Sequence, residues 1–75
     1  MMLDQAVLEQ WMAGHHVPGV GFFLYEPVVI TAGPLAGTVG AVVALVSLTP
    51  NPLYTVEIAG GRSDVHLPES DLEGA

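Results

Sequence analysis

The sequence predicts a mainly β fold, a small antiparallel barrel of about five strands that follows a short amphipathic helix. Apolar residues recur at helical spacing only near the start of the chain, and from residue 20 onward they alternate or form short valine-rich runs. Glycine and proline separate these runs, and closing the sheet on itself hides its edges. The 75 residues leave room for one domain, residues 1–75, with the helix and a connector at 1–18 and the barrel at 19–75.

The helix is expected over residues 3–13. Asp4 can accept a backbone N–H at its amino end, and Gly14 can take the left-handed conformation that ends a helix. One side of this helix carries the apolar residues Leu3, Val7, Leu8, Trp11 and Met12. We expect this stripe to dock on the chain's own core, with Trp11 and Met12 buried, because a helix of about three turns is marginal alone in water. The alternative is that the stripe anchors a partner or a second copy of the chain.

The barrel strands are expected at residues 20–24, 28–32, 38–47, 54–58 and 64–67. The longest of them is apolar on both alternations, which is typical of a central strand with both faces partly covered. Gly40 offers a bulge or a kink within it. The sheet is therefore expected to bend around this strand.

Loops are expected at residues 33–37 and 49–52, which are rich in glycine and proline. Gly60 and Gly61 suit a tight hairpin between the last two strands. The acidic tail that follows predicts a single 3₁₀ turn, with Leu72 held against the barrel.

Residues 27–56 contain no charged side chain, and this stretch is longer than the about 20 residues that a membrane-spanning helix needs. Prolines and glycines interrupt it, and its apolar residues are mainly valine, a composition that favours strands. We expect strands here and keep a membrane-associated protein as an alternative. Acidic residues, and no basic ones, stand among the first nine residues, so we expect no secretory signal and a cytoplasmic location.

The chain is strongly acidic. Its eight acidic side chains face one basic side chain, Arg62, and the formal net charge is −7. Nucleic-acid binding depends on several lysines or arginines, so a nucleic-acid partner is excluded, and an anionic membrane surface would also repel the chain. A basic protein is the favoured partner because opposite charge speeds association. The alternative is that the charge only keeps an apolar small domain in solution.

The sequence offers no motif for catalysis, a metal or a cofactor. It has no cysteine, and His15, His16 and His66 are not spaced as a zinc set. No serine lies in a nucleophile motif, and without lysine there is no phosphate-binding Gly-Lys-Ser/Thr sequence. The acids at 69, 71 and 73 lack the length and the central glycine of a calcium loop. We therefore expect a protein that is not an enzyme and binds no metal or cofactor.

Residues 33–42, Gly-Pro-Leu-Ala-Gly-Thr-Val-Gly-Ala-Val, preceded by the apolar run at 28–30, resemble the KOW segment of SH3-like barrels. Over residues 23–73 the chain is similar to small SH3-like immunity proteins of bacterial polymorphic toxin systems. The resemblance implies an SH3-like barrel that binds and blocks a cognate toxin, often a basic nuclease, and has no chemistry of its own. It supplies no defined contact residue and does not include the amino-terminal helix. The association of KOW segments with RNA does not fit a chain with one basic side chain.

We expect the partner to bind the acidic side chains of the last two strands and the tail, which are Glu57, Asp64, Glu69, Asp71 and Glu73. The leading hypothesis is a non-enzymatic protein-binding module, and an immunity protein that blocks a basic toxin is its narrower form. A structural or self-associating domain, the subunit of a homo-oligomer, is the main alternative, and a membrane-associated protein is a further one. If no partner binds there, the same carboxylates form a solvated strand face.

Overall fold

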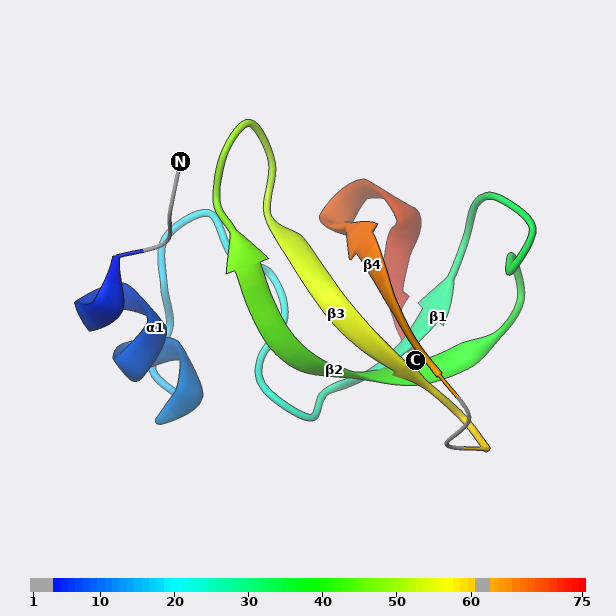
Figure 1. Cartoon of the computed structure of the whole chain (residues 1–75), viewed down its shortest axis with the longest axis horizontal. Helices are drawn as coiled ribbons and strands as arrows, with labels where there is room; N and C mark the ends of the chain where they lie inside the picture. Colours follow the sequence, from blue (N-terminus) through cyan, green and yellow to red (C-terminus); the bar gives the residue numbers. More distant parts are fainter. Residues whose placement is uncertain (1–3, 61–62) are drawn as a thin grey trace.

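A computed structural model of the chain describes residues 4–60 and 63–75. Its elements in chain order are α1 (Gln5–Met12), β1 (Pro27–Ile30), β2 (Val39–Ser47), β3 (Leu53–Ile58), β4 (Asp64–Pro68), the 3₁₀ helix η1 (Glu69–Asp71) and β5 (Leu72–Gly74). The strands form one antiparallel sheet of five strands in the order β4-β3-β2-β1-β5 (Figure 1). This confirms the predicted mainly β fold with a short amino-terminal helix, and the arrangement fits a small SH3-like barrel.

The central strand β2 bends along its length, and the sheet rolls around it (Figure 1). Its register against β3 shifts twice, between Val42 and Ala44 and between Leu45 and Ser47. Each such irregularity increases the local bend and twist of the strand that contains it. The bend therefore comes from the middle and the end of β2.

Gly40 has a different role from the bulge or kink that the sequence predicts. It keeps a regular register with Val28 on β1 and Ile58 on β3. A Cβ atom at this position would lie 2.6 Å from the carbonyl oxygen of Glu57 and 2.8 Å from Cγ1 of Val56. Glycine is thus required here because the backbone of β3 comes too close for any side chain.

The prediction of a strand at residues 20–24 is wrong. This segment runs as an irregular loop, although Val20 is buried. Side chains bond two of its backbone groups: the N–H of Gly21 donates to a carboxylate oxygen of Glu69 at 2.8 Å, and the carbonyl of Phe22 accepts from the indole of Trp11 at 2.8 Å. These two groups are therefore not available to a strand ladder, and the segment belongs to none of the described strands.

The fifth strand of the sheet is instead β5, in the tail of the chain. It lies antiparallel to β1, with Leu72 opposite Ile30 and both side chains buried. The predicted 3₁₀ turn before it is confirmed as η1, and so is the placement of Leu72 against the core. The tail therefore contributes a strand as well as a turn.

Local signals at the chain's turns and caps are confirmed. Asp4 caps α1 by accepting from the N–H of Ala6 at 2.8 Å, and Gly14 ends the helix with a φ of +87°. Gly33 and Gly37 both take positive φ in the loop between β1 and β2. The predicted hairpin at residues 60–61 includes Gly61, which lies outside the described residues. These positions depend on neighbours in sequence, which is why the sequence indicates them.

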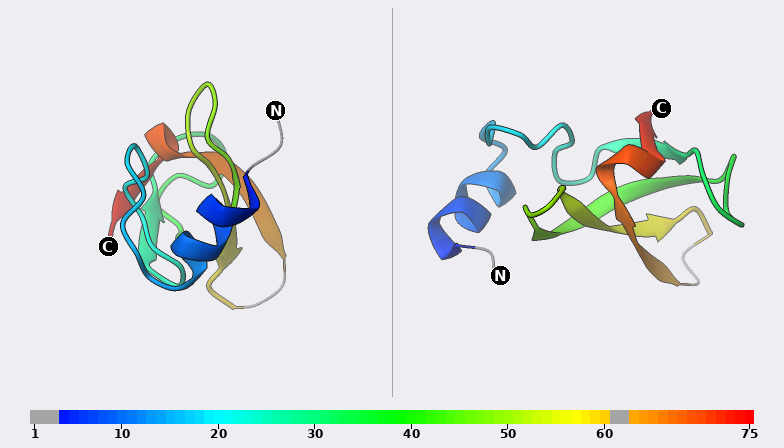
Figure 2. Two further views of the ribbon diagram at one scale, coloured as in Figure 1. Left: turned by 90° about the vertical axis from the view of Figure 1, so that its left-hand side faces the viewer. Right: turned by 90° about the horizontal axis from the view of Figure 1, so that it is seen from above.

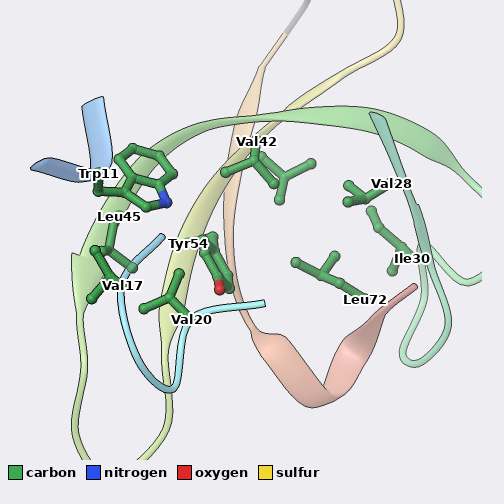
Figure 3. Close-up of a cluster of buried hydrophobic side chains, with 10 residues drawn as sticks. Trp11, Val17, Val20, Val28, Ile30, Val42, Leu45, Tyr54 and Leu72 are labelled. Atoms are coloured by element: carbon green, nitrogen blue, oxygen red, sulfur yellow. The ribbon is translucent and has the colours of Figure 1, made fainter. Parts of the chain in front are cut away.

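One hydrophobic core fills the space inside the curved sheet (Figure 3). Its buried members are Trp11, Val17, Val20, Val28, Ile30, Val42, Leu45, Tyr54, Val56 and Leu72. They come from the helix, the following loop and four of the strands, so the core includes residues on both sides of the predicted boundary between residues 18 and 19.

The helix α1 lies across one end of the barrel (Figures 1 and 2). Trp11 is its buried residue, 1% exposed, and its indole Nε1 donates to the carbonyl of Phe22 at 2.8 Å. Figure 3 shows the indole beside Leu45 and on the same side of the core as Val17. The predicted docking of the helix on its own domain is thus confirmed. The predicted burial of Met12 is wrong, because that side chain is 56% exposed.

Replacing Trp11 by alanine should lower the free energy of unfolding by about 3–5 kcal/mol, because it leaves a cavity at the end of the core and removes a hydrogen bond. The exposed neighbour gives a matched control: Met12→Ala should change it by no more than about 0.5 kcal/mol. Urea unfolding followed by circular dichroism measures both. Equal losses in the two variants would show that the helix does not seal the core.

Replacing Gly40 by alanine should destabilise the fold by about 1–3 kcal/mol, because the new methyl group meets backbone that cannot move without breaking the ladder between β2 and β3. Gly74→Ala is the control, since its Cβ would meet only a carboxylate oxygen of Glu26, at 3.9 Å. Thermal melts of both variants test this expectation, and a Gly40→Ala protein as stable as wild type would contradict it.

Candidate functional site

The acidic residues that the sequence predicts as a binding surface lie in three different settings. Glu69 begins η1 and is half-buried. Its Oε1 accepts two hydrogen bonds, from the hydroxyl of Tyr54 at 2.6 Å and from the N–H of Gly21 at 2.8 Å. This carboxylate therefore holds three parts of the chain together: β3, η1 and the loop before β1.

Tyr54 is the partner of Glu69 on the core side. Its side chain is fully buried, and its ring meets that of Phe22 edge-on with centroids 5.6 Å apart. Burial raises the pKa of the Tyr54 hydroxyl above its ordinary value of 10.0, and the Glu69 carboxylate raises it further. The hydroxyl consequently stays neutral and acts as a hydrogen-bond donor to the carboxylate, which is a structural role.

Asp71 and Glu73 lie further along the tail. Asp71 is half-buried at the end of η1, and its backbone carbonyl accepts from the N–H of Thr31 at 2.8 Å. Glu73 is exposed on β5, where it lies opposite Val29 of β1. Because β5 and β4 are at opposite ends of the strand order, Glu73 and Asp64 stand on different edge strands.

Glu57 and Asp64 are the two acids that the fold places side by side. They lie directly opposite each other on β3 and β4, and both side chains are exposed. We call these two residues the β3–β4 acidic pair. Like charges in directly opposite positions of an antiparallel ladder repel each other. Residues 4–60 and 63–75 contain no lysine or arginine, because Arg62 is the chain's only residue of either kind and lies outside those ranges.

The contact between Tyr54 and Glu69 is not among the predictions made from the sequence. One signal for it is present, since the alternation of β3 points Tyr54 into the core and a buried tyrosine hydroxyl normally finds a hydrogen-bond partner. The sequence does not indicate which acid supplies that partner. Of the predicted binding residues, the structure thus uses Glu69 inside the fold and leaves the β3–β4 acidic pair outside it.

Stability at alkaline pH tests the Tyr54 environment. A raised pKa in the folded state contributes stability that is fully present below the unfolded value near pH 10 and is lost as the pH rises beyond it. Tyr54→Phe should therefore flatten the alkaline fall in stability, and at pH 7 it should cost about 1–2 kcal/mol because Glu69 loses a donor. Urea unfolding over a pH series measures both effects.

Tyr25→Phe is the control for that series, because Tyr25 is 72% exposed. This variant should keep the alkaline behaviour of the wild-type protein. The interpretation would be wrong if Tyr54→Phe and Tyr25→Phe gave the same profile.

Across the described ranges, no group of three or more His, Asp or Glu side chains is placed to share a metal ion. No helix in this part of the chain has both the length and the apolar character needed to cross a membrane. Comparison with protein families, with curated proteins and with solved structures finds no match to this chain.

Proposed function

We propose that the chain is a non-enzymatic, cytoplasmic protein-binding module that engages a basic protein through its acidic surface. The observation that carries this proposal is the β3–β4 acidic pair, two exposed carboxylates held opposite each other on neighbouring strands. A positive group from a partner would relieve the repulsion between them as well as gain attraction of its own. The position of the pair thus favours a cationic ligand.

The whole chain adds to this local effect. A formal net charge of −7 on 75 residues creates a negative field that speeds encounter with a basic protein, and this advantage falls as salt increases. Such complementarity changes association rates more than final affinity. Salt-dependent association is therefore the property that best distinguishes this function from a merely solvated acidic face.

The five predicted residues take different parts in the proposed surface. Glu57 and Asp64 make direct contact with the partner, while Asp71 and Glu73 contribute mainly to the field. Glu69 has a structural part, since its carboxylate already accepts hydrogen bonds from Tyr54 and Gly21. A partner would have to break those hydrogen bonds to reach it, so direct contact with Glu69 is disfavoured.

A narrower form of the proposal is an immunity protein that blocks a basic toxin domain. Support for it comes from the resemblance of residues 23–73 to small SH3-like immunity proteins and from the acidic charge. Binding alone would suffice for this role, because an inhibitor needs to cover its target and not to react with it.

Differential capture tests the proposal. The immobilised chain should retain a basic protein from a lysate of the source cells at low salt and release it at high salt. Glu57→Gln should retain much less of the same protein. With the purified partner, this variant should associate about three- to fivefold more slowly at low salt, and the difference should shrink as salt is added.

Glu9→Gln is the matched control, because Glu9 is also an exposed glutamate but lies on α1, away from the acidic pair. Both variants remove one charge from the same total, so a simple loss of net charge would slow them equally. Equal behaviour of the two variants, or capture that does not respond to salt, would overturn the assignment of the binding surface.

A further inference from the structure

One edge of the sheet is open next to the β3–β4 acidic pair. β4 is the terminal strand in the order of the sheet and pairs with β3 on one side only. Edge strands present unpaired N–H and C=O groups, which another chain can use for pairing.

The hydrogen bonds that flank β4 show which of its residues direct their backbone groups toward the open edge. Beside its two ends, the N–H of Ile58 donates to the carbonyl of Ser63 at 3.4 Å, and the N–H of Glu69 donates to the carbonyl of Pro52 at 2.9 Å. Hydrogen-bonded pairs alternate along an antiparallel ladder. Val65 and Leu67 therefore direct their backbone groups toward β3.

It follows that Asp64 and His66 direct their N–H and C=O groups away from β3, toward the open edge. Both residues are exposed, and no tertiary backbone hydrogen bond from another described segment reaches them. Their side chains share the outer face with Glu57, which is opposite Asp64. The open edge thus combines free backbone groups with a negative outer face.

We propose that this edge accepts an extended segment of the basic partner as an additional strand. The inference rests on the proposed function and names how that partner binds. Strand addition gains its affinity from main-chain hydrogen bonds and its specificity from alternate side chains. Here the added strand bonds to the backbone of Asp64 and His66, and its outward side chains face the acidic pair.

The two faces of β4 determine the sequence of that segment. Residues directly opposite one another share a face, so the added side chain next to Asp64 lies on the acidic face and must be lysine or arginine. The intervening side chains fall on the inner side, beside the half-buried Val65 and Leu67, and should be apolar. The ligand is therefore a strand in which basic and apolar residues alternate.

A second copy of the chain is a poor occupant of this edge. It would bring together two chains that each carry a net charge of −7, and two acidic edges with them. Inward and edge charges are a common device against such pairing between identical edges. Charge thus selects a basic segment over self-association.

Short peptides of about six residues are a direct probe. One alternates lysine and valine, a second has the same composition with the lysines and valines in separate blocks, and a third alternates serine and valine. The wild-type chain should bind the alternating lysine peptide roughly tenfold more tightly than the blocked one. Glu57→Gln should weaken binding of the alternating lysine peptide, whereas Glu9→Gln should leave it near the wild-type value.

A backbone variant tests the strand itself. His66→Pro removes an N–H that points to the open edge and spares the ladder to β3, so it should abolish the preference for the alternating peptide. His66→Ala keeps the N–H and should retain the preference. Amide exchange in the unaltered protein gives a second measurement: the alternating peptide should newly protect Asp64 and His66, while Val65 and Leu67 are already protected in the free protein.

The outcomes separate the two proposals. Equal binding of both lysine peptides without new protection of Asp64 and His66 would overturn strand addition, while a loss of binding in Glu57→Gln would still support the acidic surface. If neither lysine peptide bound more tightly than the serine peptide, the acidic surface would fail as well.

Discussion

The shared hydrogen bonds of Glu69 are the constraint on which the rest of the structure depends. By accepting from Gly21 and Tyr54 at once, this carboxylate fixes the loop before β1 against the core. The fixed loop presents the ring of Phe22 to Tyr54 and the carbonyl of Phe22 to the indole of Trp11. An acid from the tail thus fixes the segment against which the helix packs at the end of the barrel.

The acidic residues consequently divide into two kinds. Glu69 is used for stability, since a half-buried carboxylate with two donors strengthens the native arrangement. Glu57 and Asp64 differ from it, because their positions directly opposite each other in the ladder bring two like charges together. A small domain is only marginally stable, so the position of two like charges beside an edge strand fits the proposed role in binding.

Features that depend on neighbours in sequence could be predicted, and those that depend on distant partners could not. Asp4 at the start of α1, the glycines of the loop after β1 and the 3₁₀ turn before Leu72 follow from local preferences. The error at residues 20–24 has a different origin. Their apolar pattern is typical of a strand. However, the N–H of Gly21 donates to Glu69, which is distant in the sequence, and the carbonyl of Phe22 accepts from Trp11 on α1.

By itself, the sequence determined the class of fold, the position of the helix and most of the strands, and its net charge of −7 is the basis for proposing a basic partner. Periodicity, turn residues and composition are properties of short segments, so they do not depend on how the chain closes. Only the tertiary structure decided which acids face water and which accept hydrogen bonds within the fold, that the tail supplies the fifth strand, and which residues of β4 direct their backbone groups away from β3. Those outcomes depend on strand register and on contacts between residues far apart in the chain, where a shift of a single residue would reverse every side chain between core and solvent.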